Sequence, residues 1–431
     1  MDQKPNIELA VPSTLADLQG LVHNQGVMNS DYPALGECST DDFFVTSSTW
    51  NNDGYYDRNA YIWAKAIFDI NPGINDADWS DSYVQVYYAN VVLEDLPKIS
   101  YSASQQDLYN QVKGSALFFR SMAFYNLVQT FALPYDPMTS KTDLGIPLRL
   151  TSDINAKSTR ATVQQCYDQI LNDLQTALAL LPDKGADASA PSKAATYGLL
   201  SRIDLVLGNY PESLKNANNC LAIYNTLQDF NQLNSYAFPV YPDFSPEELL
   251  HGSLTGVAMV GFHSNIDSTL YKTYNDPNDL RLAIFFYNNN GQIEFNSQFG
   301  THNTITSSVS TNEVYLNKAE CEARAGDVQS AMTDLNTLLK TRWVTGTFKP
   351  YIAVSADNAL NIILLERRKE LVFTGIRWTD LRRLNKDPRF AVTLTRNING
   401  NTYTLPPNDP RYALPIPDNE IQLSGLPQNN R

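Results

Sequence analysis

One charged cluster in the sequence is dense enough to suggest an active site. Glu366 and Glu370 lie four residues apart, on one face of a predicted helix. Two such carboxylates can act as general acid and base when they face a cleft and their pKa values are separated. Arg367, Arg368 and Lys369 lie between them, and interleaved cations favour ionised, salt-bridged acids. We therefore expect an ion-pair network that locks the last helices.

Metal and nucleophile chemistry is not indicated by any residue spacing. The four histidines are widely separated, and the four cysteines form no CxxC or Cys/His pattern. Residues 75–78 (Asn-Asp-Ala-Asp) lack the glycine and final glutamate of a calcium loop, and a helix N-cap before Trp79 explains Asp78. The sequence has no phosphate-cradling glycine loop and no nucleophile elbow. We predict no metal, no cofactor and no catalytic residue.

Aromatic residues are the informative excess, with 24 tyrosines and 18 phenylalanines. A sugar ring stacks its C–H face on an aromatic plane, and its hydroxyls bond to Asn, Asp or Tyr side chains. The candidate ligand-binding residues are Trp50, Asn51, Tyr55 and Tyr56 in one turn-rich loop and Phe262, Tyr271 and Tyr274 in a second stretch. Packing of these rings in the core is the alternative for both stretches. Trp63, Trp79 and Trp378 are expected to be structural.

Composition limits the possible partners. The net charge of −14 repels phosphate backbones and anionic lipid head groups, which argues against nucleic acid as a partner. The 431 residues are 43% hydrophobic, which is typical of a globular chain. No run of about 18 apolar residues occurs, so no membrane-spanning helix is expected. The polar start, Met1 to Asn6, shows no signal-peptide pattern.

Helix starts are marked by a Ser or Thr followed three residues later by Gln or Glu, because the two side chains cap each other's backbone amides. We predict such capping boxes at Ser102 with Gln105, Thr162 with Gln165 and Ser310 with Glu313. Apolar residues follow the first two at a spacing of three or four, which predicts long amphipathic helices. Pro182 ends the second of these helices.

Two later segments repeat each other. Tyr197, Ser201, Gly208 and Ser213 correspond in spacing to Tyr315, Ala319, Gly326 and Ala331. The glycines suit a left-handed C-cap, and small residues allow close helix crossing. This pattern is typical of tetratricopeptide-type (TPR) helix hairpins, although generic helix-hairpin chemistry is the alternative. Residues 38–78 and 226–310 read instead as loops and brief strands inserted into the helical frame.

Four ordered stretches resemble the SusD/RagB family. They are Trp79 to Leu96, Val112 to Tyr135, residues 307–342, and residues 364–384 with residues 412–421. The first is similar to the family's W-x3-Y-x2-I-x3-N helix, with Val86 at the isoleucine position. The last is the most specific, because LLERRKELVFTGIRWTDLRRL resembles ERRxELxFEGxRxxDLxR. Thr374 replaces the usual glutamate before Gly375.

The resemblance implies a mainly α fold and a single SusD-like domain over residues 1–431. About four TPR-like helix-hairpin pairs carry irregular loop and short-strand insertions. We expect an N-terminal SusD-like region over 10–225, an irregular insertion over 226–310 and a C-terminal RagB/SusD region over 311–431.

The resemblance also implies a non-enzymatic lipoprotein on the outer membrane, with its export signal and lipidated cysteine upstream of this sequence. Such a protein binds glycans or oligosaccharides for polysaccharide utilization and nutrient uptake, with a TonB-dependent transporter (SusC/RagA-like) as partner. The alternatives are a peptide-binding RagB-type lid, an all-helical glycoside hydrolase and a cytosolic repeat scaffold.

Overall fold

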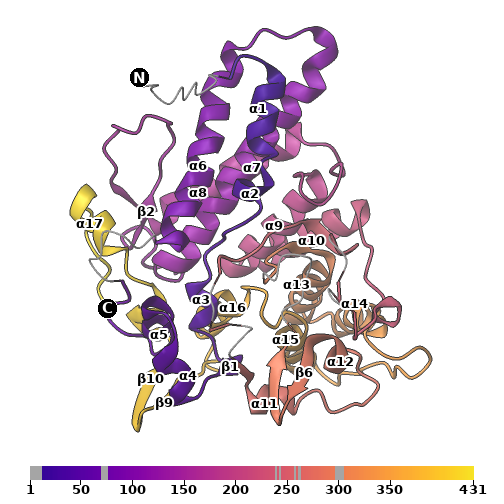
Figure 1. Cartoon of the computed structure of the whole chain (residues 1–431). Helices are drawn as coiled ribbons and strands as arrows, with labels where there is room; N and C mark the ends of the chain where they lie inside the picture. Colours follow the sequence, from indigo (N-terminus) through magenta and orange to yellow (C-terminus); the bar gives the residue numbers. More distant parts are fainter. Residues whose placement is uncertain are drawn as a thin grey trace.

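Long helices build the frame of the molecule, as the capping and repeat patterns predict. The computed structural model describes residues 12–68, 76–237, 240–241, 244–256, 259–260, 264–296 and 305–431. The frame helices are α6 (Ala77–Asp95), α7 (Gln106–Phe131), α8 (Val163–Leu180), α9 (Lys193–Val206), α10 (Tyr210–Ile223), α13 (Thr311–Arg324), α14 (Val328–Lys340) and α15 (Ala356–Glu370). Helix α7 packs on α6 and α8, α9 packs on α10, and α13 packs on α10, α14 and α15 (Figure 1). This arrangement confirms the mainly α, TPR-like fold.

Shorter helices decorate this frame. They are α1 (Leu15–Val22), α2 (Gln25–Met28), α3 (Leu35–Cys38), α4 (Ser47–Asn52), α5 (Tyr55–Tyr61), α11 (Ser268–Tyr271), α12 (Arg281–Phe285), α16 (Arg377–Leu384) and α17 (Asp418–Ser424). Helices α4 and α5 fall in the stretch 38–78 that we expected to be non-helical. That expectation was wrong there, because Thr46 caps α4 by accepting a hydrogen bond from the Thr49 amide.

Two of the three predicted capping boxes are confirmed. Ser102 and Gln105 cap a short 3-10 turn that leads into α7. The Gln165 amide donates to Thr162 Oγ1 at 3.2 Å at the start of α8. The box at Ser310 was wrong, because the Glu313 carboxylate is held by a distant arginine of α9 and does not reach back to the cap.

The predicted helix hairpins are confirmed in α9–α10 and α13–α14. Gly208 and Gly326 end the first helix of each pair with φ of +73° and +88°, a conformation that disfavours any side chain. Ser213 Oγ donates to the Ser201 carbonyl at 2.8 Å, and Ala319 is fully buried at the equivalent crossing. The small residues therefore allow the two helices of each pair to pack closely.

Short strands lie in the insertion and also in segments outside it. The strands are β1 (Phe43–Phe44), β2 (Leu144–Pro147), β3 (Arg160–Thr162), β4 (Glu248–Leu250), β5 (Asn265–Ile266), β6 (Phe286–Asn289), β7 (Gln292–Phe295), β8 (Val309–Ser310), β9 (Leu394–Ile398) and β10 (Asn401–Leu405). An antiparallel sheet has the order β1-β5-β7-β6, and β2–β3, β4–β8 and β9–β10 form separate pairs. The sheet therefore joins the N-terminal segment to the insertion.

Buried ion pairs fix the insertion to the C-terminal helices. Arg281, which has no exposed surface, contacts Asp279 at 2.8 Å, Glu366 at 2.7 Å and Glu370 at 3.3 Å. Arg342 contacts the other side of Glu370 at 2.7 Å. The predicted ion-pair network is confirmed, although the arginines that pair with Glu366 and Glu370 come from outside the segment 366–370.

The remaining core is apolar and extends through the whole frame. Trp63, Trp79 and Trp378 are all buried, in agreement with their expected structural role. Within the described residues, no helix combines the length and the apolar composition needed to cross a membrane.

The Arg281 network makes a direct stability prediction. Replacing this side chain in Arg281→Met leaves three buried carboxylates without their shared cation, so we expect the free energy of unfolding to fall by about 3–5 kcal/mol. Urea denaturation measures it. The matched control is Arg389→Met, whose half-exposed side chain pairs with Asp357 and should change little. Equal, small losses in both variants would contradict a structural role for the network.

Candidate functional site

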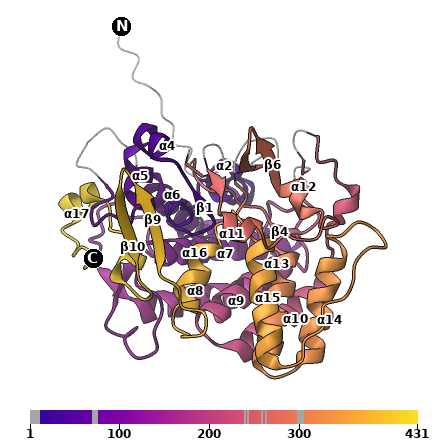
Figure 2. The same ribbon diagram turned by 90° about the horizontal axis from the view of Figure 1, so that it is seen from below.

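Pairing of β1 with β5 brings the two predicted aromatic stretches to the same side of the molecule. Phe44 pairs with Asn265, and the Asp267 amide donates to the Asp42 carbonyl at 2.8 Å. Both views place α4, β1 and β6 along one edge, and in Figure 2 the frame helices α8, α9 and α10 lie on the opposite side (Figures 1 and 2). We call this edge the α4–β1 face.

Trp50 lies half-buried on α4, with its ring orientation fixed by polar contacts. Its indole Nε1 donates to the Arg58 carbonyl at 3.0 Å, and the Arg58 guanidinium lies 5.5 Å from the ring centroid. Both contacts come from α5, so the two short helices hold the ring between them. A ring held in this way loses little entropy when a ligand stacks on it.

Asn51 links α4 to the turn of the β9–β10 hairpin. Its side-chain amide exchanges hydrogen bonds with that of Asn399, at 2.9 and 3.3 Å. Ser47 Oγ accepts a hydrogen bond from the backbone amide of Asn399 at 2.9 Å. Asn399 and Gly400 both have positive φ, as a tight hairpin turn requires. The predicted ligand residue Asn51 therefore has a structural partner as well as an exposed position.

Tyr55 and Tyr56 differ in exposure. Tyr55 is 44% exposed at the start of α5, and its ring meets the edge of Tyr56 at 6.1 Å between centroids. Tyr56 packs against Phe68 at 5.1 Å and is only partly exposed. Tyr55 is therefore the ring of this pair that a ligand can reach.

The second predicted stretch contributes less than expected. Tyr274 is 4% exposed, and its hydroxyl donates to the Lys369 carbonyl at 2.7 Å, so it packs in the core and offers no surface to a ligand. Tyr271 is partly buried against Phe286, at 5.7 Å between centroids. Phe262 lies outside the described residues. Only Tyr271 of this group remains a described candidate.

A pocket of about 290 Å³ opens on the α4–β1 face, close to the lower size limit of small-molecule sites. Its polar lining includes Asp267, Thr395 and Asn397, and the exposed ring of Phe44 forms part of its wall. The pocket thus combines an aromatic surface with amide, hydroxyl and carboxylate groups. This combination suits a ligand with both apolar and hydroxyl-bearing faces.

Arg396 anchors the β9–β10 hairpin beside this pocket. Its guanidinium lies 3.5 Å from the centroid of Tyr61 and 5.0 Å from that of Trp63, and it donates to the Thr40 carbonyl. Burial lowers the pKa of this guanidinium from its usual value. The contacts hold β9 in place against the segment that leads into β1.

Two further arginines bind the residues that follow Thr40 and precede β1. Arg377 forms a two-point ion pair with Asp41 at 2.7 and 2.9 Å, and Arg368 contacts Asp42 at 2.8 Å. Burial would raise the pKa of Asp41, but the two guanidinium groups hold it well below its usual range. These ion pairs fix the residues immediately before β1.

The acidic groups near α5 have raised pKa values. Burial and the nearby Asp53 raise the pKa of Asp57 to about 7. Burial raises the pKa of Asp78 to about 6, although the amides of Leu35 and Ala34 donate to this carboxylate at 2.8 and 2.7 Å. The prediction that Asp78 caps α6 was wrong, because its carboxylate caps the start of α3.

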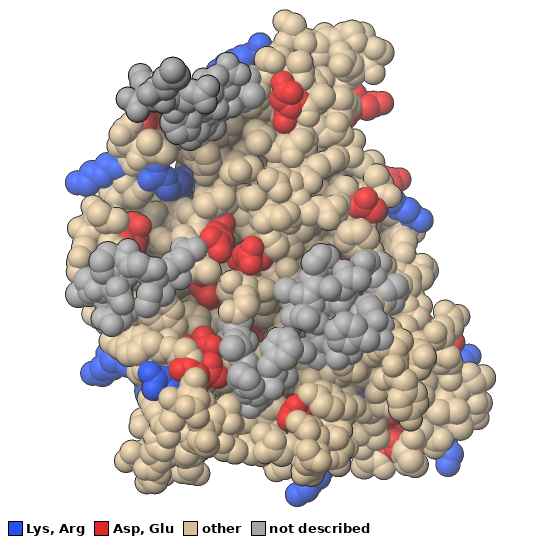
Figure 3. Space-filling model, viewed as in Figure 1, with Lys and Arg blue, Asp and Glu red and all other residues tan. Residues whose placement is uncertain are grey.

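Acidic side chains also gather in the middle of the face seen in Figure 3, whereas Lys and Arg side chains lie mainly at its margin. In the described part of the chain, no group of three or more His, Cys, Asp or Glu side chains is placed to hold a metal ion. All four cysteines are free and buried.

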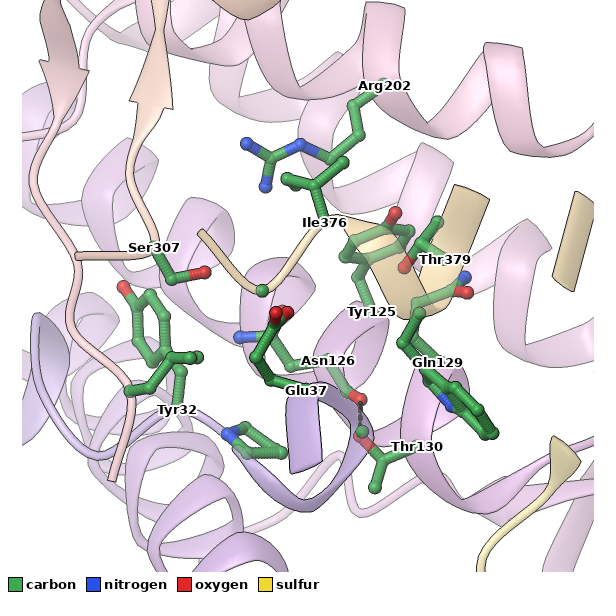
Figure 4. Close-up of a pocket in the computed structure, with 15 residues that line it drawn as sticks. Tyr32, Glu37, Tyr125, Asn126, Gln129, Thr130, Arg202, Ser307, Ile376 and Thr379 are labelled. Carbon is green, nitrogen blue, oxygen red and sulfur yellow. Dashed lines mark hydrogen bonds between the residues drawn. The ribbon is translucent and has the colours of Figure 1, made fainter. Parts of the chain in front are cut away.

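A second, smaller cavity lies between α3, α7 and α16 (Figure 4). Its volume of about 40 Å³ accommodates about three water-sized molecules, too few for a sugar ring. The Glu37 carboxylate, 2% exposed, lines it together with Asn126 and Trp378. Neither carboxylate oxygen accepts a hydrogen bond of normal length and angle from the described residues, although the Gly375 amide lies near enough to affect its pKa. Asn126 Nδ2 and Trp378 Nε1 likewise have no hydrogen-bond partner among the described residues.

Some residues of the candidate site were not predicted from the sequence. Phe44 sits in a two-residue strand whose exposed and buried positions alternate, a signal too short to detect. Thr395 and Asn397 alternate outward in β9, but nothing local indicates that this hairpin reaches α4. Only long-range pairing places these residues together.

Comparisons with known proteins agree with this architecture. A family model described as "Starch-binding associating with outer membrane" matches residues 1–205, and one described as "SusD family" matches residues 311–430. The chain belongs to the SusD/RagB family. A protein named SusD-like protein P2, from Formosa agariphila, is 25% identical in an alignment 427 residues long. The match covers 83% of this chain and 80% of that protein.

Solved structures show the same fold. A SusD superfamily protein from Bacteroides thetaiotaomicron superposes with a TM-score of 0.77 at 23% identity, covering 97% of this chain and 100% of that one. A SusD-like carbohydrate binding protein from Bacteroides vulgatus gives a TM-score of 0.71 at 19% identity, covering 96% and 97%.

The Glu37 cavity predicts an unusual dependence of stability on pH. Burial and the neighbouring Asp42 raise the pKa of Glu37 well above its ordinary value of 4.5, and the Gly375 amide and Arg377 oppose this shift only in part. The folded chain therefore holds this proton more tightly than the unfolded chain, so the stabilisation is complete below about pH 4.5 and is lost as pH rises toward the folded pKa.

We expect Glu37→Gln to remove this loss, so that the variant gains stability relative to the parent chain as pH rises from 5 to 8. Urea denaturation at several pH values measures the difference. Glu212→Gln, at a half-exposed pair with Lys215, is the control. A difference between Glu37→Gln and the parent that does not change with pH would show that the raised pKa is wrong.

Proposed function

We propose that this chain captures carbohydrate at the α4–β1 face and performs no chemistry on it. The observation that carries the proposal is a pocket walled by Phe44 and lined by amide, hydroxyl and carboxylate groups. A reachable ring, Tyr55, and an oriented ring, Trp50, lie on the neighbouring helices α5 and α4. Sugars need both kinds of group, since one face of the ring is apolar and its edge carries hydroxyls.

A hydrolytic role receives no support from the acidic residues that first suggested one. Glu366 and Glu370 are buried and paired with Arg281, so neither carboxylate faces a cleft that could hold a sugar and a water molecule. Glycoside hydrolysis requires two carboxylates on either side of the bond that is cleaved. Binding without hydrolysis is therefore the function that we propose.

We further propose that the protein acts as a lipid-anchored component of the outer membrane, in partnership with a TonB-dependent transporter for nutrient uptake. Membership of the SusD/RagB family and the description of the model that matches residues 1–205 support this placement. The relatives named for sugar or carbohydrate binding support the ligand class. A peptide ligand is the second candidate, because the net charge of −14 would attract basic peptides.

Calorimetry can test the ligand class and the site together. The purified chain is titrated with malto-, cello-, xylo- and laminarihexaose and, separately, with a lysine-rich hexapeptide. We expect at least one hexaose to bind, and we expect Tyr55→Ala to weaken that binding at least about threefold through the loss of ring stacking.

Tyr101→Ala is the matched control for this titration. Tyr101 is similarly exposed and stacks on Tyr109 near the start of α7, so its removal should leave affinity unchanged. Binding of the hexapeptide alone would contradict the proposed ligand class. Equal affinities for the parent chain and Tyr55→Ala would remove this ring from the site.

The proposed partner is tested by affinity purification of the tagged full-length protein from the outer membrane of its own host. We expect a TonB-dependent transporter to co-purify in amounts close to one transporter per binding protein. Recovery of the protein without any such transporter, under conditions that preserve other outer-membrane complexes, would contradict the partnership.

A further inference from the structure

The outer face of the four-stranded sheet carries an uninterrupted row of four paired residues. Phe44 pairs with Asn265, Asn265 pairs with Glu294, and Glu294 pairs with Tyr287. Directly paired residues of adjacent strands project from the same face of a sheet. One side chain from each of β1, β5, β7 and β6 therefore points in the same direction.

This row points away from the core. The neighbouring pairs, Phe43 with Ile266 and Phe286 with Phe295, are buried on the inner face. The two ends of the row, in contrast, are open to solvent, since Phe44 is 45% and Tyr287 is 46% exposed. Asn265 and Glu294, between them, are each only 7% exposed, so two exposed rings flank a recessed polar centre.

Glu294, at the centre of the row, is held in one orientation. The Tyr287 hydroxyl donates a hydrogen bond to Glu294 Oε2 at 2.5 Å, and Asn289 Nδ2 donates one to Oε1 at 2.9 Å. A carboxylate has about four acceptor positions on its two oxygens. Each oxygen of Glu294 has one described donor, so both keep capacity to accept another hydrogen bond.

Tyr287 contributes the fixed donor across the working pH range. Burial and its hydrogen bond to Glu294 raise the pKa of the Tyr287 hydroxyl to about 12. The hydroxyl therefore remains protonated and keeps the carboxylate aligned. Burial of Glu294, which is only 7% exposed, prevents the free rotation of an ordinary surface glutamate.

We propose that this row is a sugar-binding subsite in which Glu294 accepts hydrogen bonds from two adjacent hydroxyls of a neutral sugar, with Phe44 and Tyr287 as stacking surfaces on either side. The proposal rests on the carbohydrate-binding function proposed above and adds a specific anchor to it. A neutral sugar suits the row better than an acidic one, because a carboxylate at the anchor would repel Glu294.

The subsite continues the pocket of the α4–β1 face. Phe44 belongs to both, because it is also one of the residues that line that pocket. Three strand spacings separate Phe44 from Tyr287, about 14 Å in all. An extended oligosaccharide that crosses the sheet can therefore contact the pocket, Phe44, Glu294 and Tyr287 in that order.

Calorimetry with the panel of four neutral hexaoses and the corresponding disaccharides tests the subsite. Relative to the parent chain, we expect Glu294→Gln to weaken hexaose binding about tenfold or more, because hydrogen bonds to a charged group are lost. Tyr287→Phe keeps the ring and removes the donor that orients Glu294, so a smaller loss is expected. Tyr287→Ala should weaken the hexaose more than the disaccharide.

Gln292→Ala is the matched control, since Gln292 is an exposed residue of the same strand that lies outside the row. Circular dichroism and melting temperature confirm that each variant is folded. A parent chain that binds no hexaose overturns the carbohydrate function and this subsite together. Hexaose binding that is unchanged in Glu294→Gln and Tyr287→Ala overturns the subsite alone.

A lysine-containing hexapeptide distinguishes the remaining ligand class. A protonated amine could also approach Glu294. Displacement of the bound hexaose by this peptide, lost in Glu294→Gln, would overturn the assignment of the row to sugars. Absence of displacement, with the tenfold loss in Glu294→Gln retained, supports it.

Discussion

The last turns of α15 hold together the segments on which the rest of the structure depends. Each of five consecutive residues, Glu366, Arg367, Arg368, Lys369 and Glu370, forms an ion pair. The partners lie in the insertion, in α16, in the segment before β1, just after α14 and within the five residues themselves. A helix projects successive side chains about 100° apart, so one short stretch can reach neighbours on all sides. Because all of these groups except the partly exposed Arg368 are buried, their pairs must be complete, since an unpaired buried charge would strongly destabilise the fold.

This constraint explains how a helical frame can present a binding face built from short, irregular elements. Strand β1 has two residues and β5 has two, too few to form a stable sheet alone. Arg368 and Arg377 fix the residues before β1, and Arg281 and Arg342 fix the segments around the rest of the sheet. Rings and amides on such a face are already placed before a ligand arrives, which reduces the entropic cost of binding.

The sequence predicts the parts of the molecule that rest on local interactions. Thr162 with Gln165, and the glycines at 208 and 326, are interpreted correctly because caps and left-handed turns involve neighbouring residues. The capping box predicted at Ser310 was wrong because Glu313 pairs with a buried arginine, Arg202, which is distant in sequence. Helices α4 and α5 were missed because their Asn, Asp and Gly residues favour turns locally.

The candidate site was harder to predict for the same reason. Tyr55 and Tyr274 both have Asn, Asp and Tyr residues nearby in the sequence. Tyr55 is nevertheless exposed, whereas Tyr274 is buried against Phe286. The partner of β1 lies in the distant insertion, so the row from Phe44 to Tyr287 has no local signature.

The central claim is that a rigid frame presents the α4–β1 face for carbohydrate capture. A crystal structure of the chain with its tightest-binding hexaose tests this claim most directly. The account predicts sugar rings on α4, β1 and the outer face of the sheet, with the frame helices unmoved from their unliganded positions. A ligand bound elsewhere, or a frame that rearranges around it, would contradict the account.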